Sequence, residues 1–406
     1  MTSIIVSLYL IVPSMGTFIL IYFIIFIAVD GFIKNMKFNS ISKYSKLLES
    51  PEQYNLNSEY INLLKISEDD EPLVRVIDVF CRENKVYETG AIVSLSGGVD
   101  SMVTLAILLY LKQRYNFSLY TASINYGLRE ESIDEINFLR EYTDFFGITS
   151  YVSEVKNLSR KKSDSGSRTE FESASRIIRF DTYKQIIQDN FLSQYSNNIG
   201  VFVAHHKDDI VENIFTNIMK GGDVLDLEVM KPISTIHDVI IFRPLLSFKK
   251  QVIYDFAHKY DIPYFLDTTP DWSRRGKMRN EIFPLLDSVF GIDWHNKMKN
   301  IGSQSNEFGN YINQYIIDPW FELIEFSTEH SMYSKYIIIP IKEQPKLIYS
   351  KIIMKSLHNI GERMIKQTSM NKIMVLINHN NNMKEISLDG NRYAKIDGEK
   401  LHIYKK

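Results

Sequence analysis

The sequence predicts an α/β protein built on a doubly wound parallel sheet, with a C-terminal domain that is mainly helical and ends in a small β element. Three observations support this fold class. Apolar, β-rich runs alternate regularly with helical patterns, the alternation stops after Pro284, and two turn signals return near the end, at Asp389-Gly390 and Asp397-Gly398. Strands that alternate with helices are typical of parallel sheets, because each crossover is a helix.

The expected elements follow in order along the chain. An amphipathic helix is expected at 72–83, ahead of the alternating region. The expected strands are 91–96, 118–126, 149–155, 198–205 and 239–243, and the helices between them are 101–114, 131–146, 169–192 and 208–220. Farther on, 291–330 and 345–380 are expected to be mostly helical, and 385–406 to form a meander of three short strands. Since ligands in doubly wound sheets bind beyond the carboxyl ends of the strands, we expect functional residues directly after the strand runs.

These patterns divide the chain into five parts. The expected parts are a hydrophobic N-terminal segment (1–35), a linker with a helical extension (36–88), the sheet domain (89–246), a connecting segment with a basic loop (247–290) and the C-terminal domain (291–406).

The composition is that of an ordinary globular protein. The 406 residues include 47 Lys+Arg and 49 Asp+Glu, which gives a formal net charge of -2. This balance excludes a generally basic nucleic-acid coat, although it is compatible with a local basic surface. A single cysteine, Cys81, excludes a disulfide framework and a cluster of thiolate metal ligands.

The N-terminal segment allows three interpretations. Residues 4–29 carry no charged side chain and are long enough to span a bilayer as a single anchor. The lysines that follow would then place the rest of the chain in the cytosol. A cleaved targeting segment is the second interpretation, and a mis-assigned start with Met36 as the true first residue is the third.

The strongest local signal is a glycine turn between a buried strand and a helix. Residues 91–96 are followed by Gly97, Gly98 and Val99, and then by Asp100 and Ser101. Glycines at such a turn let backbone N–H groups approach an anion, and the helix N-terminus adds partial positive charge. The hydroxyls of Ser96 and Ser101 can bind phosphate oxygens. Asp100 would repel a bare phosphate, so we expect a metal ion between them.

The string from Ser96 to Ser101 resembles the pyrophosphate loop of the N-type ATP pyrophosphatases, the PP-loop superfamily. The resemblance implies a fold like that of the adenine nucleotide alpha hydrolases, binding of ATP with Mg²⁺, and cleavage of ATP between its α and β phosphates. The residues that would bind ATP are Ser96, Gly97, Gly98, Val99, Asp100 and Ser101.

Further segments resemble one branch of that superfamily, the tRNA(Ile)-lysidine synthases, in order and spacing. They are Ile124–Arg129, the helix pattern Glu172-x-Ala-x-Arg176-x-x-Arg179-Phe180, the run His205-His206-Lys207-Asp208-Asp209 with Glu212, Met230-Lys231-Pro232, Arg243–Leu246, and Arg279-Asn280. By this resemblance, the partners are an isoleucine tRNA with a CAU anticodon and free lysine. ATP adenylates the C2 carbonyl of the wobble cytidine, and the lysine amine then displaces AMP.

Spacing supports catalytic roles for two helical pairs. Arg176 and Arg179 are three residues apart, so they share a helix face and could clamp phosphate or an adenylate. Asp209 and Glu212 have the same spacing and could orient the amine, and Asp209 could bind Mg²⁺ together with Asp100. Helix capping is the alternative role for these carboxylates, and for Asp208 it can be the whole role.

Other residues are expected to contact substrate or tRNA. His205 and His206 are expected to end a strand, so only one of them should face the site. The stretch from Arg274 to Asn280 is expected to be a basic, flexible loop that contacts RNA. The full set assigned to substrate or tRNA is His205, His206, Arg129, Arg243, Arg274, Arg275, Lys277, Arg279 and Asn280.

Some positions depart from the lysidine synthase pattern. Asn125 and Tyr126 stand where that family has Asp and His, which puts a metal or proton-transfer role there in doubt. Two other functions therefore stay open. One is another PP-loop enzyme, either a tRNA thiolase or an amidating ligase with a small-molecule acceptor, and the other is a non-catalytic, membrane-tethered RNA-binding derivative.

Overall fold

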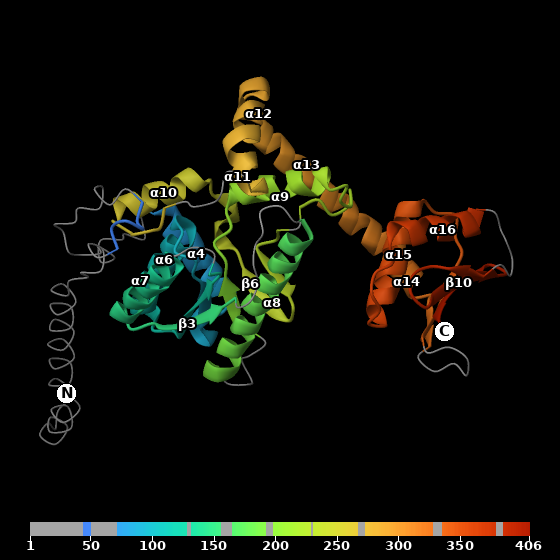
Figure 1. The fold of residues 1–406 in the computed structure, drawn as a ribbon, viewed down its shortest axis with the longest axis horizontal. Helices are drawn as coiled ribbons and strands as arrows, with labels where there is room; N and C mark the ends of the chain where they lie inside the picture. The colour runs from blue at the N-terminus through green and yellow to red at the C-terminus, as the bar shows by residue number, and fades with distance from the viewer. Residues whose placement is uncertain are drawn as a thin grey trace, which may run out of the picture. The chain divides into compact units, whose positions relative to one another are not determined.

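The computed structural model describes residues 44–49, 71–127, 131–155, 165–191, 198–228, 230–266, 273–327, 335–378 and 385–406. These residues form two compact units (Figure 1). The first comprises the described parts of Met1–Thr216 and Val229–Lys299, and the second comprises Asn217–Glu228 and Asn300–Lys406. The segment 4–29 lies outside the described residues, and within the described ones no helix is both long and apolar enough to cross a membrane.

The first unit is built on a six-stranded sheet with the strand order β3-β2-β1-β4-β6-β5. The five parallel strands are β1 (Ala91–Ser94), β2 (Leu119–Asn125), β3 (Thr149–Glu154), β4 (Gly200–Phe202) and β6 (Val239–Phe242). All five were predicted, and so was the doubly wound order, in which the chain moves outward from β1 in both directions. The predicted fold class is confirmed.

The sixth strand, β5 (Ile233–Ile236), was not predicted. It pairs antiparallel with β6 through a tight turn at His237 and Asp238, which both have positive φ angles, 48° and 62°. Asn-Gly and Asp-Gly are the usual signals for such a turn, and this chain has neither there. The strand lies at the edge of the sheet and is partly exposed, so its sequence lacks the apolar run of the inner strands.

Helices cover both faces of the sheet, because the central strand is apolar on both sides. Ala91 and Val93 of β1 belong to a core shared with α4 (Pro72–Glu83), α6 (Val99–Tyr115), α7 (Ser132–Phe145) and α10 (Lys250–Lys259). Ile92 points the other way, into a core with α8 (Ser165–Asn190). The predicted helix 72–83 is confirmed with these bounds. The remaining elements of the unit are α5 (Val86–Thr89), α9 (Lys207–Met219), η3 (Pro244–Ser247), α11 (Arg274–Lys277), η4 (Met278–Ile282) and α12 (Phe283–Phe290).

Residues 44–49, which lie in the stretch interpreted as a linker, pack into this first core. Leu48 is fully buried and forms a β-bridge with Phe265. Tyr44 stacks edge-on against Phe138 at a centroid distance of 5.6 Å. The backbone N–H of Phe265 donates to the carbonyl of Gly97. Residues 44–49 therefore pack against a residue that is bonded to the glycine turn after β1.

The second unit is a five-stranded antiparallel sheet with helices against it. The strands, in the order β7-β8-β11-β10-β9, are β7 (Glu325–Ser327), β8 (Lys335–Pro340), β11 (Lys400–Lys405), β10 (Arg392–Asp397) and β9 (Ile386–Ser387). The helices are α13 (Trp294–Ile312, which begins in the first unit), η5 (Asn313–Ile317), α14 (Asp318–Phe321), α15 (Lys346–Asn359) and α16 (Gln367–Asn378). Trp320 is almost fully buried in the core of this unit. The predicted helical character and terminal meander are confirmed, but β7 lies in a stretch predicted as helical.

Candidate active site

The glycine turn after β1 is held in shape by its own hydroxyl groups. Ser101 Oγ donates to the carbonyl of Gly98 at 2.9 Å and accepts from the backbone N–H of Ser96 at 3.2 Å. Gly97 has φ +81°, and a Cβ there would lie 2.0 Å from the ring of Phe265. The position therefore requires glycine on both conformational and steric grounds. A turn of this kind, opening the long helix α6, is suited to bind an anion.

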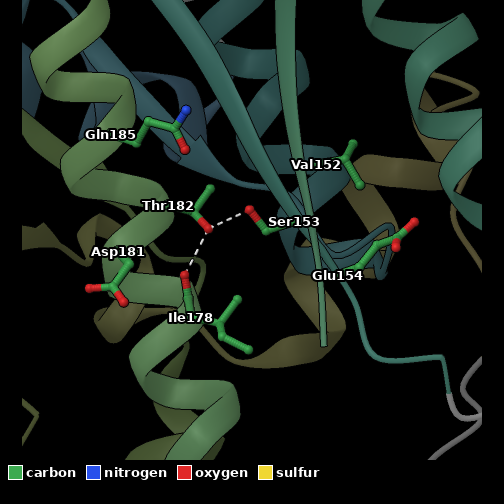
Figure 2. A pocket seen from close by; sticks show the side chains of 7 residues that line it. All are labelled: Val152, Ser153, Glu154, Ile178, Asp181, Thr182 and Gln185. Atoms are coloured by element: carbon green, nitrogen blue, oxygen red, sulfur yellow. Dashed lines mark hydrogen bonds between the residues drawn. The ribbon is translucent and has the colours of Figure 1, made fainter. Parts of the chain in front are cut away.

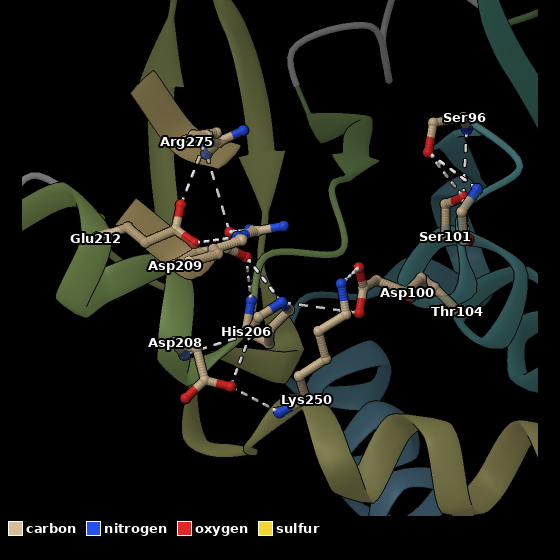
Figure 3. A network of polar contacts seen from close by, with 12 residues as sticks. Ser96, Asp100, Ser101, Thr104, His206, Asp208, Asp209, Glu212, Lys250 and Arg275 are labelled. Carbon is tan, nitrogen blue, oxygen red and sulfur yellow. Dashed lines mark hydrogen bonds and ion pairs between the residues drawn. The ribbon is translucent and has the colours of Figure 1, made fainter. Parts of the chain in front are cut away.

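This turn faces the loop after β4, because β1 and β4 are neighbours from which the chain leaves in opposite directions. Such a topological switch point is where doubly wound sheets bind ligands. Figure 3 shows that Asp100, His206 and Asp209 from these two segments lie close together, with Lys250 of α10 beside them. The predicted residues of these two motifs thus form one site.

A buried imidazole occupies the centre of the site. Nε2 of His206 lies 3.8 Å from Oδ1 of Asp100 and 3.4 Å from Oδ2 of Asp209. Its Nδ1 lies 3.6 Å from Oδ2 of Asp208. The three carboxylates come from the first turns of two helices, α6 and α9, so His206 links the glycine turn to the start of α9.

The expected strand end at residue 205, on which the prediction for the two histidines rested, was wrong. Strand β4 ends at Phe202, so His205 and His206 lie in the following loop and do not alternate as strand residues do. His205 lies beside Arg243, whose Nε donates to its Nδ1 at 3.1 Å. The two imidazoles therefore serve opposite sides of the site, one among carboxylates and one beside an arginine.

Asp209 and Glu212 are buried on α9 and face two arginines. Arg279 donates from Nε to Glu212 and lies 3.5 Å from Oδ1 of Asp209. Arg275 Nε lies 3.3 Å from Oε2 of Glu212. Asp209 also accepts from the backbone N–H of His206 at 3.0 Å, so it caps its own helix as well as facing the arginines.

The basic stretch is helical, not the flexible loop that we expected. Ser273 caps it by accepting from the N–H of Gly276 at 2.9 Å, and α11 continues directly into η4 and α12. The helix gives the cations different partners. Arg275 and Arg279 face the carboxylates of α9, although Arg275 is itself exposed. Arg274 and Lys277 are also exposed. Asn280 is exposed on the following turn.

Arg176 and Arg179 have different surroundings although they share a helix. Arg179 is partly buried and donates to the phenol oxygen of Tyr126, at the end of β2. Arg176 is exposed, and its guanidinium group lies 5.2 Å from the ring centre of Phe180. Burial, together with the charge of Arg176, lowers the pKa of Arg243. These arginines thus form the basic side of the site, opposite the carboxylates.

Sequence reasoning missed Lys250, the first residue of α10. Its Nζ lies 3.8 Å from Oδ2 of Asp100, and its backbone N–H donates to Oδ2 of Asp208 at 2.9 Å. Asp208, for which we expected a capping role, therefore caps α10 and not its own helix. No motif marks Lys250, because it lies 150 residues from Asp100 in the chain and only the sheet order brings them together.

Burial and charge set the ionisation of the site. Burial raises the pKa of Asp100 above its ordinary value, although Lys250 and His206 act against it. Burial would also raise the pKa of Asp209. Its effect is outweighed by His206, His205, the hydrogen bond from the N–H of His206, and Arg275, so the pKa of Asp209 is below its usual range. Burial lowers the pKa of His205 to about 4, so this imidazole is neutral at physiological pH.

A separate hollow of about 570 Å³ lies between β3 and α8 (Figure 2). It is lined by Ser153, Glu154, Asp181, Thr182 and neighbouring residues, and Thr182 donates to Ser153 at 2.7 Å. None of the residues that we assign to ATP or to catalysis lines it, so it is not part of the candidate site. One predicted position, Arg129, lies outside the described residues.

The fold and the site define an α/β nucleotide-binding protein with a phosphate loop at its topological switch point. The PP-loop domain family matches residues 72–286, which is 215 of the 406 residues. The chain belongs to this family.

The chain is similar to several curated relatives that are named tRNA(Ile)-lysidine synthase. That of Chlamydia caviae is 28% identical over 233 residues, covering 57% of this chain and 68% of the relative. That of Chlamydia abortus is 28% identical over 255 residues, covering 62% and 74%. That of Clostridium tetani is 30% identical over 285 residues, covering 66% and 55%.

Among solved structures, the U34-tRNA thiolase of Methanococcus maripaludis matches with a TM-score of 0.42 and 18% identity, covering 60% of this chain and 81% of the thiolase.

Proposed function

We propose that the protein is an ATP-dependent tRNA-modifying ligase of the tRNA(Ile)-lysidine synthase type. The observation that supports this most strongly is that the Ser96–Ser101 turn meets His205, His206 and the start of α9 at the switch point of the sheet. Both segments follow the lysidine synthase pattern in residue type and spacing. Relatives that bear this name match 57% and 62% of this chain.

The proposed reaction has two steps. In the first, O2 of the wobble cytidine attacks the α-phosphate of ATP, a new P–O bond forms, and pyrophosphate leaves. In the second, the ε-amine of lysine attacks C2, a C–N bond forms, and AMP departs with the former O2. The attacking amine must lose a proton, so a carboxylate beside it is required.

The two sides of the site suit these two steps. The Ser96–Ser101 turn would hold the leaving pyrophosphate through backbone N–H groups. Arg179 and Arg243 on the basic side would stabilise the charge of the adenylate. Asp209 and Glu212 would bind the lysine amine and take up its proton, once the arginines that now pair with them give way.

The residues also fit Mg²⁺. Oδ1 of Asp100 and Oε2 of Glu212 are buried and accept no hydrogen bond in the part of the chain that the structure describes. Carboxylate oxygens are the ligands that Mg²⁺ prefers, and Mg²⁺ usually combines one or two of them with phosphate oxygens and water. Within the described ranges no three such side chains form a ready cage. We propose Asp100 and Asp209 as the protein ligands of a Mg²⁺ that would neutralise phosphate charge, since both carboxylates lie beside Nε2 of His206, at 3.8 and 3.4 Å.

The alternatives receive less support. A thiolase needs reactive thiols, whereas Cys81 is buried on α4 and burial raises its pKa to about 12. A non-catalytic derivative would not need to keep Asp100, the capped turn and the paired carboxylates of α9 together. A small-molecule ligase remains the main competitor, and the next experiment separates it from the RNA ligase.

The test is the formation of AMP from ATP in the presence of an isoleucine tRNA transcript and lysine. We expect AMP only when both are present, and only if the wobble base of the transcript is cytidine. Asp100→Asn should fold normally and form no AMP, since the change removes only a charge. AMP formation that ignores RNA and depends on a small acceptor would contradict the proposal. We also place the reaction in the cytosol, where tRNA, ATP and lysine occur together.

A further inference from the structure

Lys250 reaches the glycine turn from an element outside the motifs discussed so far. Its side chain is 24% exposed, and its Nζ lies 3.8 Å from Oδ2 of Asp100. That distance is too long for a hydrogen bond, so the ammonium group is close to the carboxylate without being fixed to it. It also lies 5.5 Å from the ring centre of Tyr254, one turn farther along α10.

The backbone of Lys250 is held much more firmly than its side chain. Asp208 accepts from its N–H at 2.9 Å, and the N–H of Lys207 donates to the carbonyl of Phe248 at 2.8 Å. These two bonds tie the start of α10 to the start of α9. Farther along, Ile253 and Phe256 of α10 are buried in the core shared with α6. The backbone of Lys250 is therefore fixed, and its ammonium group lies beside the turn.

The surroundings of Asp100 suggest what the lysine does there. Oδ1 of Asp100 is buried and accepts no hydrogen bond from the described residues, and Nε2 of His206 lies 3.8 Å from it. Oδ2 faces the ammonium group of Lys250 at 3.8 Å, which is also beyond hydrogen-bond distance. The negative charge of such a buried carboxylate is only partly neutralised, so a bound cation would stabilise it. A Mg²⁺ ion held by Asp100 would compensate that carboxylate, and the ammonium group of Lys250 would then be available to another anion nearby. The nearest anions would be the phosphates held by the turn.

We propose that Lys250 is a phosphate-binding residue for the β and γ phosphates of ATP, and that Asp208 is its positioning residue. The proposal rests on the proposed function only in taking ATP as the nucleotide. Lysine suits the role because it binds phosphate as a point charge on a flexible stem. Asp208 thereby differs from Asp209 in function, although the two are adjacent in the sequence.

The test compares the affinities of the purified protein for ATP, pyrophosphate and AMP, with and without Mg²⁺, by calorimetry. Lys250→Gln should weaken binding of ATP and pyrophosphate about ten- to a hundredfold, the usual effect of a lost charge-assisted contact. Binding of AMP should stay within about twofold, because AMP lacks both outer phosphates. Lys250→Arg should restore most of the affinity. Asp208→Ala should act in the same direction with a smaller effect.

The matched control is Lys249→Gln, at the exposed neighbouring position that precedes α10. It should leave all three affinities unchanged. Equal losses for ATP and AMP in Lys250→Gln would show a structural role, and an unchanged ATP affinity would show no role, so either result overturns the proposal. Failure of the proposed function looks different: the wild-type protein would discriminate ATP from AMP through Lys250 yet modify no tRNA.

Discussion

The guanidinium group of Arg179 donates a hydrogen bond to the phenol oxygen of Tyr126. Arg179 lies on α8 and Tyr126 directly follows β2, so the pair fixes the helix to the carboxyl end of the sheet beside the glycine turn. Tyr126 stands where the lysidine synthase pattern has histidine. Both side chains can accept a hydrogen bond from an arginine, so the substitution retains a partner for Arg179.

We predict that Tyr126→Phe lowers the rate of AMP formation about tenfold, because Arg179 loses the acceptor that orients it. Tyr126→His should retain most of the rate, since imidazole can also accept. The matched control is Tyr151→Phe, which removes another tyrosine–α8 hydrogen bond, from Asn190 at 2.8 Å, away from the strand ends. The measurement is the steady-state rate of AMP formation in the wild type and the three variants. A full rate in Tyr126→Phe would mean that the pair is incidental.

The segment 44–49 should matter for the phosphate loop although no site residue lies in it. A protein that starts at Met36 should be as stable and active as the full chain. Removal of residues through Ser50 should lower the free energy of unfolding by about 2–5 kcal/mol, since it deletes the buried Leu48 beneath Phe265 and Gly97. The measurements are denaturant unfolding and ATP affinity of the two truncated proteins and the full chain. Equal stability of the two truncated proteins would show that 44–49 is dispensable.

The exposed cations of α11 should contribute to RNA binding. We expect Arg274→Gln combined with Lys277→Gln to flatten the log–log salt dependence of tRNA affinity by about 1.5, since each phosphate contact contributes about 0.7–0.9. Arg275 is left unchanged, because it faces Asp209 and Glu212.

The control for this double variant is Arg114→Gln with Arg140→Gln, which removes two exposed arginines from α6 and α7. It should leave the salt slope as in the wild type. If the α11 variant and the wild type give parallel lines across the salt series, the RNA does not contact α11.

The neutral His205 predicts a specific loss of stability in acid. Its pKa is about 4 in the folded protein and about 6.5 when unfolded, so between these values only the unfolded chain binds the proton. The free energy of unfolding should therefore fall as the pH drops below 6.5, by at most about 2 kcal/mol at pH 5. His205→Gln should remove this part of the pH dependence while remaining folded at pH 8. An identical pH dependence in both proteins would refute the assignment.

Local patterns in the sequence were sufficient to predict the parallel strands, the helices between them and the glycine turn. Helix α4 was predicted with its bounds because Pro72 starts it and its apolar face is regular. The errors concern features that depend on tertiary structure. The end of β4 at Phe202, ahead of His205, and the edge strand β5 depend on pairing with β6, which no local pattern reveals.

In the candidate site, too, local motifs could be predicted and tertiary contacts could not. The motifs identified Asp100, Asp209 and Glu212, and the structure brings the loops that carry them together. It could not be predicted that Arg275 and Arg279 face those carboxylates, since that depends on the helical phase of α11 and η4. Lys250 was missed because its role follows from the position of α10 beside α6.

The most direct test of the proposed function is to identify the modified nucleoside itself. The protein is incubated with ATP, an isoleucine tRNA with a CAU anticodon and isotopically labelled lysine, and the RNA is digested and analysed by mass spectrometry. We predict that the label appears in a single nucleoside, the wobble cytidine, with C2 bonded to the ε-nitrogen of lysine, and that one AMP forms for each modified base. An unmodified cytidine in RNA that was exposed to active, ATP-cleaving protein would contradict the proposed function.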